Sequence, residues 1–197
     1  MTTHRQQVSP HSPPEAENGT DENQISNRCP IVAVIGASSA DDKVIEMAQQ
    51  VGAAIGMQGW HLLTGGGAGV MEGACKGFVK HRKRKDAVCI GLLQSDDSDF
   101  ANRFVEVAIP TGMGCARNAL IARTADALVA VAGCSGTLSE MAFAWQMGRP
   151  IAVFQGSGGW ADKLGNTALD DRRDDVVFSA RTTDELVGFL KEKLNRP

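Results

Sequence analysis

The stretch "HLLTGGGAGVMEGACKG", residues 61–77, joins an apolar run to a helical pattern through four glycines within five residues. Glycine loses more backbone entropy on folding than any other residue. The cluster therefore indicates either a turn that only glycine can make or a backbone that closely approaches a ligand. The apolar run predicts a buried strand, and the residues from Val70 onward predict a helix. Together they predict one strand–loop–helix unit of a parallel α/β sheet.

The rest of the chain repeats this alternation from Pro30 onward. Apolar runs predict strands at 31–36, 60–64, 87–93, 104–109, 127–132, 150–154 and 175–180. Helical spacing predicts helices at about 44–58, from 70 onward, and at 115–124, 137–147 and 182–194, the last with a capping box at Thr182 and Glu185. Strands that are apolar along their whole length are typical of a parallel sheet covered on both faces. We therefore expect one Rossmann-like, doubly wound α/β domain over residues 30–197.

Composition sets the remaining bounds. Residues 1–29 are rich in Pro, Ser, Asn, Gln and Glu and contain no aromatic residue, so we expect a disordered N-terminal tail. The net charge is −3, which gives no general attraction to nucleic acid, and no apolar run is long enough to cross a membrane. We interpret the basic run Lys80–Lys85 as a solvated helix end rather than as a nucleic-acid contact.

The cysteines favour a reducing compartment. There are five, an odd number, and none form a CxxC pair, so we expect free thiols in a cytoplasmic protein. The start of the chain has no continuous apolar segment of the kind that secretory signals carry. The four histidines are scattered, so we expect neither a metal site nor a histidine-based triad.

Two glycine loops should lie at the same edge of this sheet. Gly65–Gly69 follows the second predicted strand and Gly133–Thr137 follows the fifth. Ligands of open α/β sheets bind beyond the carboxyl ends of the strands, and the free N–H groups of a helix start suit an anion, above all phosphate. Tight strand-to-helix turns alone also select glycine. Two loops at one edge favour a phosphate-bearing ligand.

The common nucleotide and hydrolase motifs are absent. Val70 stands where GxGxxG requires its last glycine, and no glycine cluster is followed by GK[ST]. In "GCSGT", Thr137 occupies the last glycine position of GxSxG. NAD binding by that fingerprint, ATP hydrolysis by a Walker loop and serine hydrolase chemistry therefore lose support.

Three segments carry a family resemblance. "TGGGAGVMEGACKG", "PTGMGCARNALIARTADALVAVAGCSGTLSE" and "AFAWQMGRPIAVF" resemble the SLOG superfamily, the Rossmann-like group related to Lonely Guy proteins and DprA. The likeness covers roughly Ile31 to Phe154 and is closest to the molybdenum cofactor carrier protein branch. It implies a doubly wound fold, a homo-oligomer (dimer or tetramer) and a pocket for a phosphorylated small molecule at the sheet edge.

The resemblance also suggests site residues. "AGCSGTLSE" is similar to the Lonely Guy motif PGGxGTxxE, but Ala132 replaces the proline and Cys134 the second glycine. Arg117 falls at the spacing of the family's arginine, and Asn118 replaces its neighbouring lysine. The expected ligand-binding residues are Gly36, Thr64, Gly65, Gly66, Gly67, Gly69, Arg117, Asn118, Gly133, Ser135, Gly136 and Thr137.

Two functions remain open at this point. One is a binding or carrier protein for a phosphorylated nucleotide- or pterin-like ligand, with the molybdenum cofactor as a possible bound ligand and no cofactor required. The other is a Lonely Guy-type nucleoside monophosphate N-glycosidase, in which Arg117 and Glu140 are catalytic. Thr137 and Glu140 also fit a T-x-x-E capping box, so Glu140 has a structural alternative. Cys134 fits either a soft-metal ligand or a small apolar filler.

Overall fold

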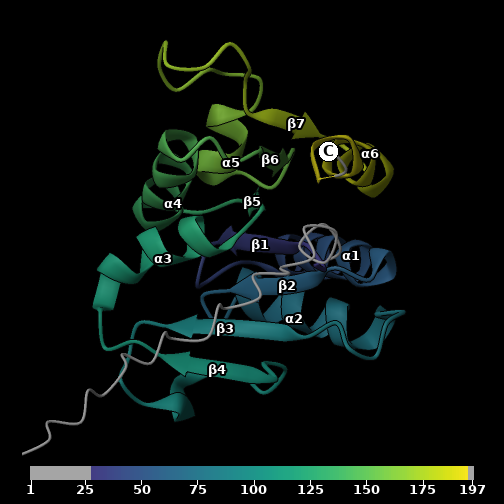
Figure 1. Cartoon of the computed structure of the whole chain (residues 1–197), viewed down its shortest axis with the longest axis vertical. Coiled ribbons are helices and arrows are strands. Elements are labelled where there is room, and N and C mark those ends of the chain that lie inside the picture. The colour runs from purple at the N-terminus through teal and green to yellow at the C-terminus, as the bar shows by residue number, and fades with distance from the viewer. Residues whose placement is uncertain (1–27, 195–197) are drawn as a thin grey trace, which may run out of the picture.

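The computed structural model describes residues 28–194. It contains one seven-stranded sheet flanked by six α-helices among these residues (Figure 1). The strands are β1 (Ile31–Gly36), β2 (His61–Thr64), β3 (Cys89–Leu93), β4 (Val107–Pro110), β5 (Ala127–Val131), β6 (Ile151–Phe154) and β7 (Phe178–Ala180). The helices are α1 (Asp42–Gln58), α2 (Val70–His81), α3 (Arg117–Thr124), α4 (Ser135–Gln146), α5 (Gly159–Leu164) and α6 (Thr183–Leu194), with short 3₁₀ helices η2 (Ser98–Phe100) and η3 (Gly114–Ala116).

All neighbouring strands run parallel, in the order β4-β3-β2-β1-β5-β6-β7. The chain therefore builds outward from β1 in one direction and, after β4, returns to add β5 on the other side of β1. This reversal is the topological switch point of a doubly wound sheet, where ligands of such folds usually bind. The fold class predicted from the sequence is confirmed.

The two faces of the sheet have separate cores. Val32 and Val34 of β1 pack on one face, in a cluster with α1, α2 and α6, whereas Ala33 and Ile35 pack on the other face with α3, α4 and α5. Figure 1 shows α1 and α6 on one side of the sheet and α3 and α4 on the other. The alternation follows from the period of two along a strand, and it explains why the strands read as continuous apolar runs.

Several glycines serve helix packing rather than a ligand. A Cβ built on Gly52 of α1 would lie 2.0 Å from the Ala74 carbonyl oxygen of α2, and one on Gly77 of α2 would lie 2.0 Å from the Gln49 carbonyl oxygen. Real Cβ atoms do not approach so closely, so these positions hold α1 and α2 together. Part of the glycine content of the opening stretch is therefore explained by this helix pair.

The helices differ from the expected ones in three places. Helix α4 begins at Ser135, after Cys134 as its N-cap, so Thr137 lies inside the helix and the T-x-x-E capping box is wrong. The predicted helix at 115–124 is a 3₁₀ turn followed by α3. The segment after β6, interpreted as a loop, contains α5, whose Ala161 is fully buried. At the last helix, Glu185 N donates to Thr182 Oγ1 at 3.2 Å, which fits the predicted cap.

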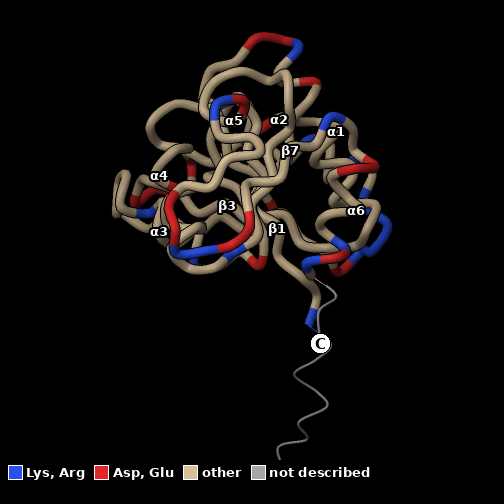
Figure 2. Tube along the Cα trace, turned by 90° about the horizontal axis from the view of Figure 1, so that it is seen from above, with Lys and Arg blue, Asp and Glu red and all other residues tan. Residues whose placement is uncertain are grey.

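Charged residues of both signs are interspersed over the outside (Figure 2). Within residues 28–194, no helix combines the length and apolar character needed to cross a membrane. The expected disordered tail lies outside the described residues except for its last two positions. There Arg28 pairs with Asp126, and Cys29 Sγ donates to the Gly59 carbonyl at 3.0 Å.

Candidate functional site

A cavity of about 630 Å³ opens at the switch point between β1 and β5. Its walls come from the loop after β1, the loop after β2, the end of β3, the start of α3 and the first turns of α4. Eight residues expected at the site line it: Gly36, Gly65, Arg117, Asn118, Ser135, Gly136, Thr137 and Glu140. Residues more than 100 positions apart in the chain thus meet at one sheet edge, because the carboxyl ends of parallel strands share that edge.

The start of α4 forms one wall of this cavity. The helix begins with Ser135, Gly136 and Thr137, so no earlier helical turn provides carbonyl groups to accept hydrogen bonds from their backbone N–H groups. The N-cap residue, Cys134, makes no side-chain capping bond. A Cβ built on Gly136 would meet only Asn118 Nδ2, at 3.8 Å, so the position opens onto free space. Exposed N–H groups at a helix start favour an anion there.

Arg117 and Glu140 form a buried pair at the base of the cavity. Arg117 is 5% exposed and Glu140 is 6% exposed, and their Nη1 and Oε1 atoms are 3.8 Å apart. That separation is an ion pair without a hydrogen bond. Nε and Nη1 of Arg117 are buried and find no hydrogen-bond partner among the described residues. Buried donors normally have partners, so this guanidinium is poised to receive an acceptor from outside the chain.

Burial changes the titration of both members of the pair. It raises the pKa of Glu140 to about 7, and the nearby Arg117 charge opposes this only in part. Burial also lowers the pKa of Arg117, against the opposing effect of Glu140. Glu140 therefore exchanges its proton near neutral pH, a property that suits a group whose charge responds to a ligand or to a reaction.

Gly65 makes room for Arg117. A Cβ at residue 65 would lie 2.3 Å from Arg117 Nη1 and 2.7 Å from Met71 Sδ. The guanidinium therefore packs directly against the glycine backbone. Gly65, the first glycine of residues 61–77, therefore contributes to the cavity by leaving space for the Arg117 side chain.

The other glycines of the first loop lie away from the cavity. A Cβ on Gly66 would meet Leu93 Cδ2 at 2.3 Å, and one on Gly69 would meet the Ala37 carbonyl oxygen at 2.5 Å. Thr64 is fully buried and its Oγ1 accepts from Gly66 N at 3.0 Å. Thr64, Gly66, Gly67 and Gly69 are not among the lining residues. They shape the turn between β2 and α2.

Asn102 holds that turn in place and was missed from the sequence. Its Nδ2 donates to the carbonyl oxygens of Gly66 at 3.0 Å and Gly67 at 2.9 Å, and its own N–H donates to Gly66 O at 2.7 Å. It stands between β3 and β4, where neither spacing nor composition marks it. Only the fold brings it under the loop.

Asn118 and Gly133 shape the second loop. Asn118 Nδ2 donates to Ser139 Oγ at 2.8 Å and to Gly136 O at 3.3 Å, so it fixes the first turn of α4. Gly133 has a φ of 97°, and a Cβ there would lie 2.4 Å from Thr137 Oγ1. Gly133 is not among the lining residues, whereas Asn118 is.

Several lining residues were not expected. They are Ile35, Ala37, Ser38, Ser39, Met71, Gln94, Cys115, Ala116, Cys134, Ser139 and Phe143. The loop after β1 carried a usable signal, since it follows the first strand of a doubly wound sheet and so borders the switch point. Cys134, which the sequence leaves open as a soft-metal ligand or a small apolar filler, is exposed.

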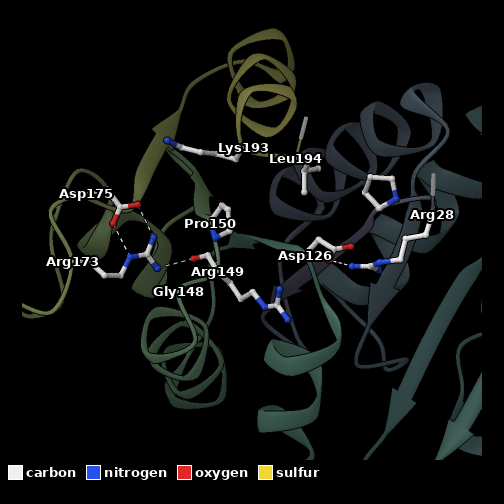
Figure 3. A pocket seen from close by; sticks show the side chains of 10 residues that line it. Arg28, Asp126, Gly148, Arg149, Pro150, Arg173, Asp175, Lys193 and Leu194 are labelled. Atoms are coloured by element: carbon white, nitrogen blue, oxygen red, sulfur yellow. Dashed lines mark hydrogen bonds and ion pairs between the residues drawn. The ribbon is translucent and has the colours of Figure 1, made fainter. Parts of the chain in front are cut away.

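A second cavity, of about 460 Å³, lies at the opposite, amino edge of the sheet (Figure 3). Arg28, Arg149, Arg173 and Lys193 line it together with Asp126 and Asp175. Most of these charges are already paired. Arg28 contacts Asp126, Arg173 contacts Asp175 and also donates to the Arg149 carbonyl, and Arg149 Nη2 donates to the Arg123 carbonyl at 3.0 Å. The contacts tie β6, α3 and the loop before β7 to one another.

The fold and the first cavity define a Rossmann-like protein with a ligand-sized cavity at the switch point of its sheet. The chain belongs to the SLOG cluster4 family, whose model matches residues 29–187. The superfamily resemblance predicted from the sequence is thereby confirmed. A relative from Archaeoglobus fulgidus, named only as an uncharacterized protein, is 38% identical over 121 residues, which is 61% of this chain and 77% of the relative.

The chain is also similar to several solved structures. TM1055 matches with a TM-score of 0.75 and 26% identity over 83% of this chain and 99% of its own. The molybdenum cofactor binding protein of Rippkaea orientalis matches with a TM-score of 0.73 and 30% identity over 84% and 98%. A molybdenum cofactor (Moco) carrier protein of Chlamydomonas reinhardtii matches with 0.70 and 32% over 85% and 98%. DNA processing protein A of Helicobacter pylori, at 15% identity and a TM-score of 0.60, shares the fold alone.

Proposed function

We propose that this protein binds and carries a phosphorylated pterin- or nucleotide-like ligand, with the molybdenum cofactor as the preferred candidate. The observation that carries the proposal is the buried Arg117, whose Nε and Nη1 lack partners among the described residues while lining a cavity of about 630 Å³. Structural neighbours that cover most of this chain are molybdenum cofactor carrier or binding proteins, which supports a carrier role.

The residues present fit such a ligand. The N–H groups of Ser135, Gly136 and Thr137 and the Arg117 guanidinium supply donors for a phosphate monoester. The open space at Gly136 lets the phosphate oxygens reach the helix backbone. Phe143 and Met71 line the same cavity and offer apolar contacts to a flat heterocycle. The bound cofactor would supply the metal chemistry, whereas the chain's own residues bind, orient and shield it.

Glu140 sets the electrostatic balance of binding. When it is ionised it attracts Arg117 and repels an incoming phosphate, and when it is protonated the arginine is free for the ligand. With its pKa raised to about 7, the cost of neutralising Glu140 near neutral pH is small. The pair therefore suits a site that takes up and releases an anion.

A direct test is binding of the molybdenum cofactor, released from a purified molybdenum enzyme, to the full-length chain under anaerobic conditions. We expect one cofactor per binding site and slower decay of the bound cofactor than of the free one. Arg117→Ala should reduce the protection, because it removes a charged donor from the site and weakens cofactor binding. The absence of any protection by the wild-type chain would contradict the carrier proposal.

The Arg117–Glu140 pair also favours a second candidate, a nucleoside 5′-monophosphate N-glycosidase. Glycosidic cleavage uses carboxyl groups to stabilise a developing positive charge and to activate water, and a carboxyl with a pKa near 7 suits general acid–base work. Incubation with AMP and with isopentenyladenosine monophosphate, followed by chromatography for released base, tests it. An enzyme would release base, and Glu140→Gln would bind the nucleotide without cleaving it.

We further propose a cytoplasmic homo-oligomer, a dimer or tetramer. Apolar side chains at the β4 edge and on α3 support an oligomer, because Val107, Ile109 and Leu120 are all exposed. Light scattering coupled to size-exclusion chromatography tests it. We expect Ile109→Asp to shift the protein toward the monomer.

A further inference from the structure

The protein's exposed thiols gather in the candidate cavity. All five cysteines are free, and Cys75 and Cys89 are buried while Cys29 is half-buried. The two exposed cysteines, Cys115 and Cys134, both line the cavity at the switch point. They come from different walls, since Cys115 lies in η3 and Cys134 caps α4. Exposed free thiols are reactive and are usually avoided, so two at one site call for an explanation.

The same cavity contains an independent sign of a ligand. The Arg117 side chain is 6% exposed, and its buried Nε and Nη1 have no hydrogen-bond partner within residues 28–194. Arg117 therefore indicates an oxyanion, and the thiols indicate a soft centre. A ligand that satisfies both must carry a negatively charged oxygen group and a thiophilic atom.

A bare metal ion does not fit these residues. No group of three or more His, Cys, Asp or Glu side chains within residues 28–194 is arranged to hold a metal. The thiols can therefore complete the coordination of a metal that arrives with ligands of its own. A metal-bearing, phosphorylated cofactor meets this condition, whereas a free nucleotide does not.

We infer that Cys134 supplies a sulfur ligand to the metal of a phosphorylated metal–pterin cofactor bound in this cavity; the inference rests on the carrier function proposed above. Cys134 directly precedes Ser135–Thr137, whose backbone N–H groups form the proposed phosphate site. In the molybdenum cofactor the phosphate and the metal-bearing sulfur atoms are attached to the same ring, so a ligand for the metal must stand near the phosphate site. Cys115 lines another wall of the same cavity, from η3.

Formation of the bond between Cys134 and the metal is a ligand exchange and involves no redox change. The Cys134 thiol loses its proton, and the sulfur lone pair forms the bond to the metal. An exchangeable hydroxide leaves the metal and takes up that proton as water. The oxidation state of the metal stays the same, so no oxidant or reductant is required.

The test compares two probes, the molybdenum cofactor and its metal-free pterin, on the full-length chain. Cys134→Ser should weaken binding of the metal-loaded form by about tenfold or more and leave the metal-free form unchanged, because only the first contains the metal–sulfur bond. Molybdenum X-ray absorption should show one more sulfur neighbour in the wild-type complex than in the Cys134→Ser complex. Iodoacetamide should label Cys134 in the free chain and in the complex with the metal-free pterin, but not in the loaded complex.

Cys29→Ser is the matched control, since Cys29 lies outside the cavity and contacts Gly59. It should change neither probe's affinity. Equal affinity of wild type and Cys134→Ser for the loaded cofactor, or the same number of sulfur neighbours in both, would overturn the inference while leaving the carrier proposal intact. A loss confined to Cys115→Ser would overturn the assignment to Cys134. Failure of the wild-type chain to bind either probe would overturn both proposals.

Discussion

The two cavities at opposite edges of the sheet differ in how their charges are used. At the amino edge, the acids Asp126 and Asp175 each contact an arginine (Figure 3). Arg149 donates there to the Arg123 backbone carbonyl. At the carboxyl edge, Arg117 faces one carboxylate at 3.8 Å, and two of its nitrogens lack partners among the described residues.

Within the described part of the chain, the two cavities differ in how many buried donors lack a partner rather than in the amount of charge, and for this reason we propose the carboxyl-edge cavity as the ligand site. The amino-edge cavity contains more arginines, but their hydrogen bonds fasten β6, α3 and the loop before β7 together. At the carboxyl edge, two buried nitrogens of Arg117 have no hydrogen-bond partner within residues 28–194, although burying an unpartnered donor normally costs free energy. The contrast is one of degree, because Arg149 in the amino-edge cavity also has one buried nitrogen without a partner among the described residues, its Nε, whereas Arg117 has two.

The largest expected effect comes from filling the open space at α4. Gly136→Val should reduce binding of a phosphorylated ligand by about a hundredfold or more, roughly 3 kcal/mol, because the side chain occupies the phosphate's place. The chain itself should tolerate the change, since a Cβ meets only Asn118 at 3.8 Å. Isothermal titration and thermal melting measure the two effects. Gly188→Val in α6, where a Cβ meets nothing within 4 Å, is the control and should leave binding unchanged. Tight binding by Gly136→Val would mean that the glycine serves the turn alone.

Removing one arginine from each cavity tests the comparison directly. Arg117→Ala should weaken ligand binding by about 1–3 kcal/mol, the range for a hydrogen bond to a charged group. Arg149→Ala should leave ligand affinity unchanged and lower the melting temperature, because it removes the contact with the Arg123 carbonyl. If both variants lose the ligand equally, the distinction between the cavities is wrong.

Two neighbouring glycines of the first loop test whether Arg117 contacts the ligand. Gly65→Ala should weaken binding by about tenfold, because the new Cβ displaces the Arg117 guanidinium, 2.3 Å away. Gly67→Ala should have little effect, since its Cβ would meet only the flexible end of Met71 at 3.0 Å. Competition against a labelled ligand compares the two. Equal losses would indicate that the loop, rather than the arginine, contacts the ligand.

The pH dependence of binding tests the role of Glu140. Its pKa is raised to about 7, so lowering the pH from 8 toward 6.5 neutralises it and should strengthen ligand binding by about 1 kcal/mol or less. Glu140→Gln should bind at pH 8 as the wild type does at lower pH, with a flatter profile. A wild-type profile that stays the same in the variant would show that another group titrates.

The raised pKa of Glu140 also makes the free energy of unfolding depend on pH. The folded state holds the Glu140 proton more tightly than the unfolded chain does, so this contribution is complete below about pH 4.5 and is lost as the pH rises through about 7. Denaturant unfolding of wild type and Glu140→Gln across this window should therefore diverge by about 1–3 kcal/mol. Parallel curves would contradict the raised pKa.

The smallest effect is expected at the amino edge. Deleting residues 1–27 keeps Arg28 and should leave the melting temperature and ligand binding almost unchanged. Arg28→Ala should cost less than about 1 kcal/mol, since its side chain is 62% exposed and surface ion pairs contribute little. Thermal denaturation measures both. A large loss on deletion would show that the tail is a structural arm of the domain.

Local sequence pattern identified the strands, but it did not show what each glycine does. The whole-length apolar runs identified the parallel strands, because a strand covered on both faces must be apolar on both. The same patterns could not separate Gly65, which lies against Arg117, from Gly77, which lies against Gln49 of a neighbouring helix. The sequence pattern around the two glycines does not distinguish their roles. Their roles depend on which atom stands opposite the missing Cβ.

The sequence by itself predicted the doubly wound fold, the sheet edge of the candidate site, and Arg117 and Glu140 as candidate site residues. The fold follows from local periodicity along the chain, the sheet edge follows from the position of the two glycine loops after strands, and the two candidate residues follow mainly from the resemblance to the SLOG superfamily. The tertiary structure alone decided that Arg117 is buried with open donors, that Asn102 braces the first loop, and that Cys115 and Cys134 share a cavity. Burial and contact across different strands and helices depend on the packed arrangement, and no spacing along the chain encodes them.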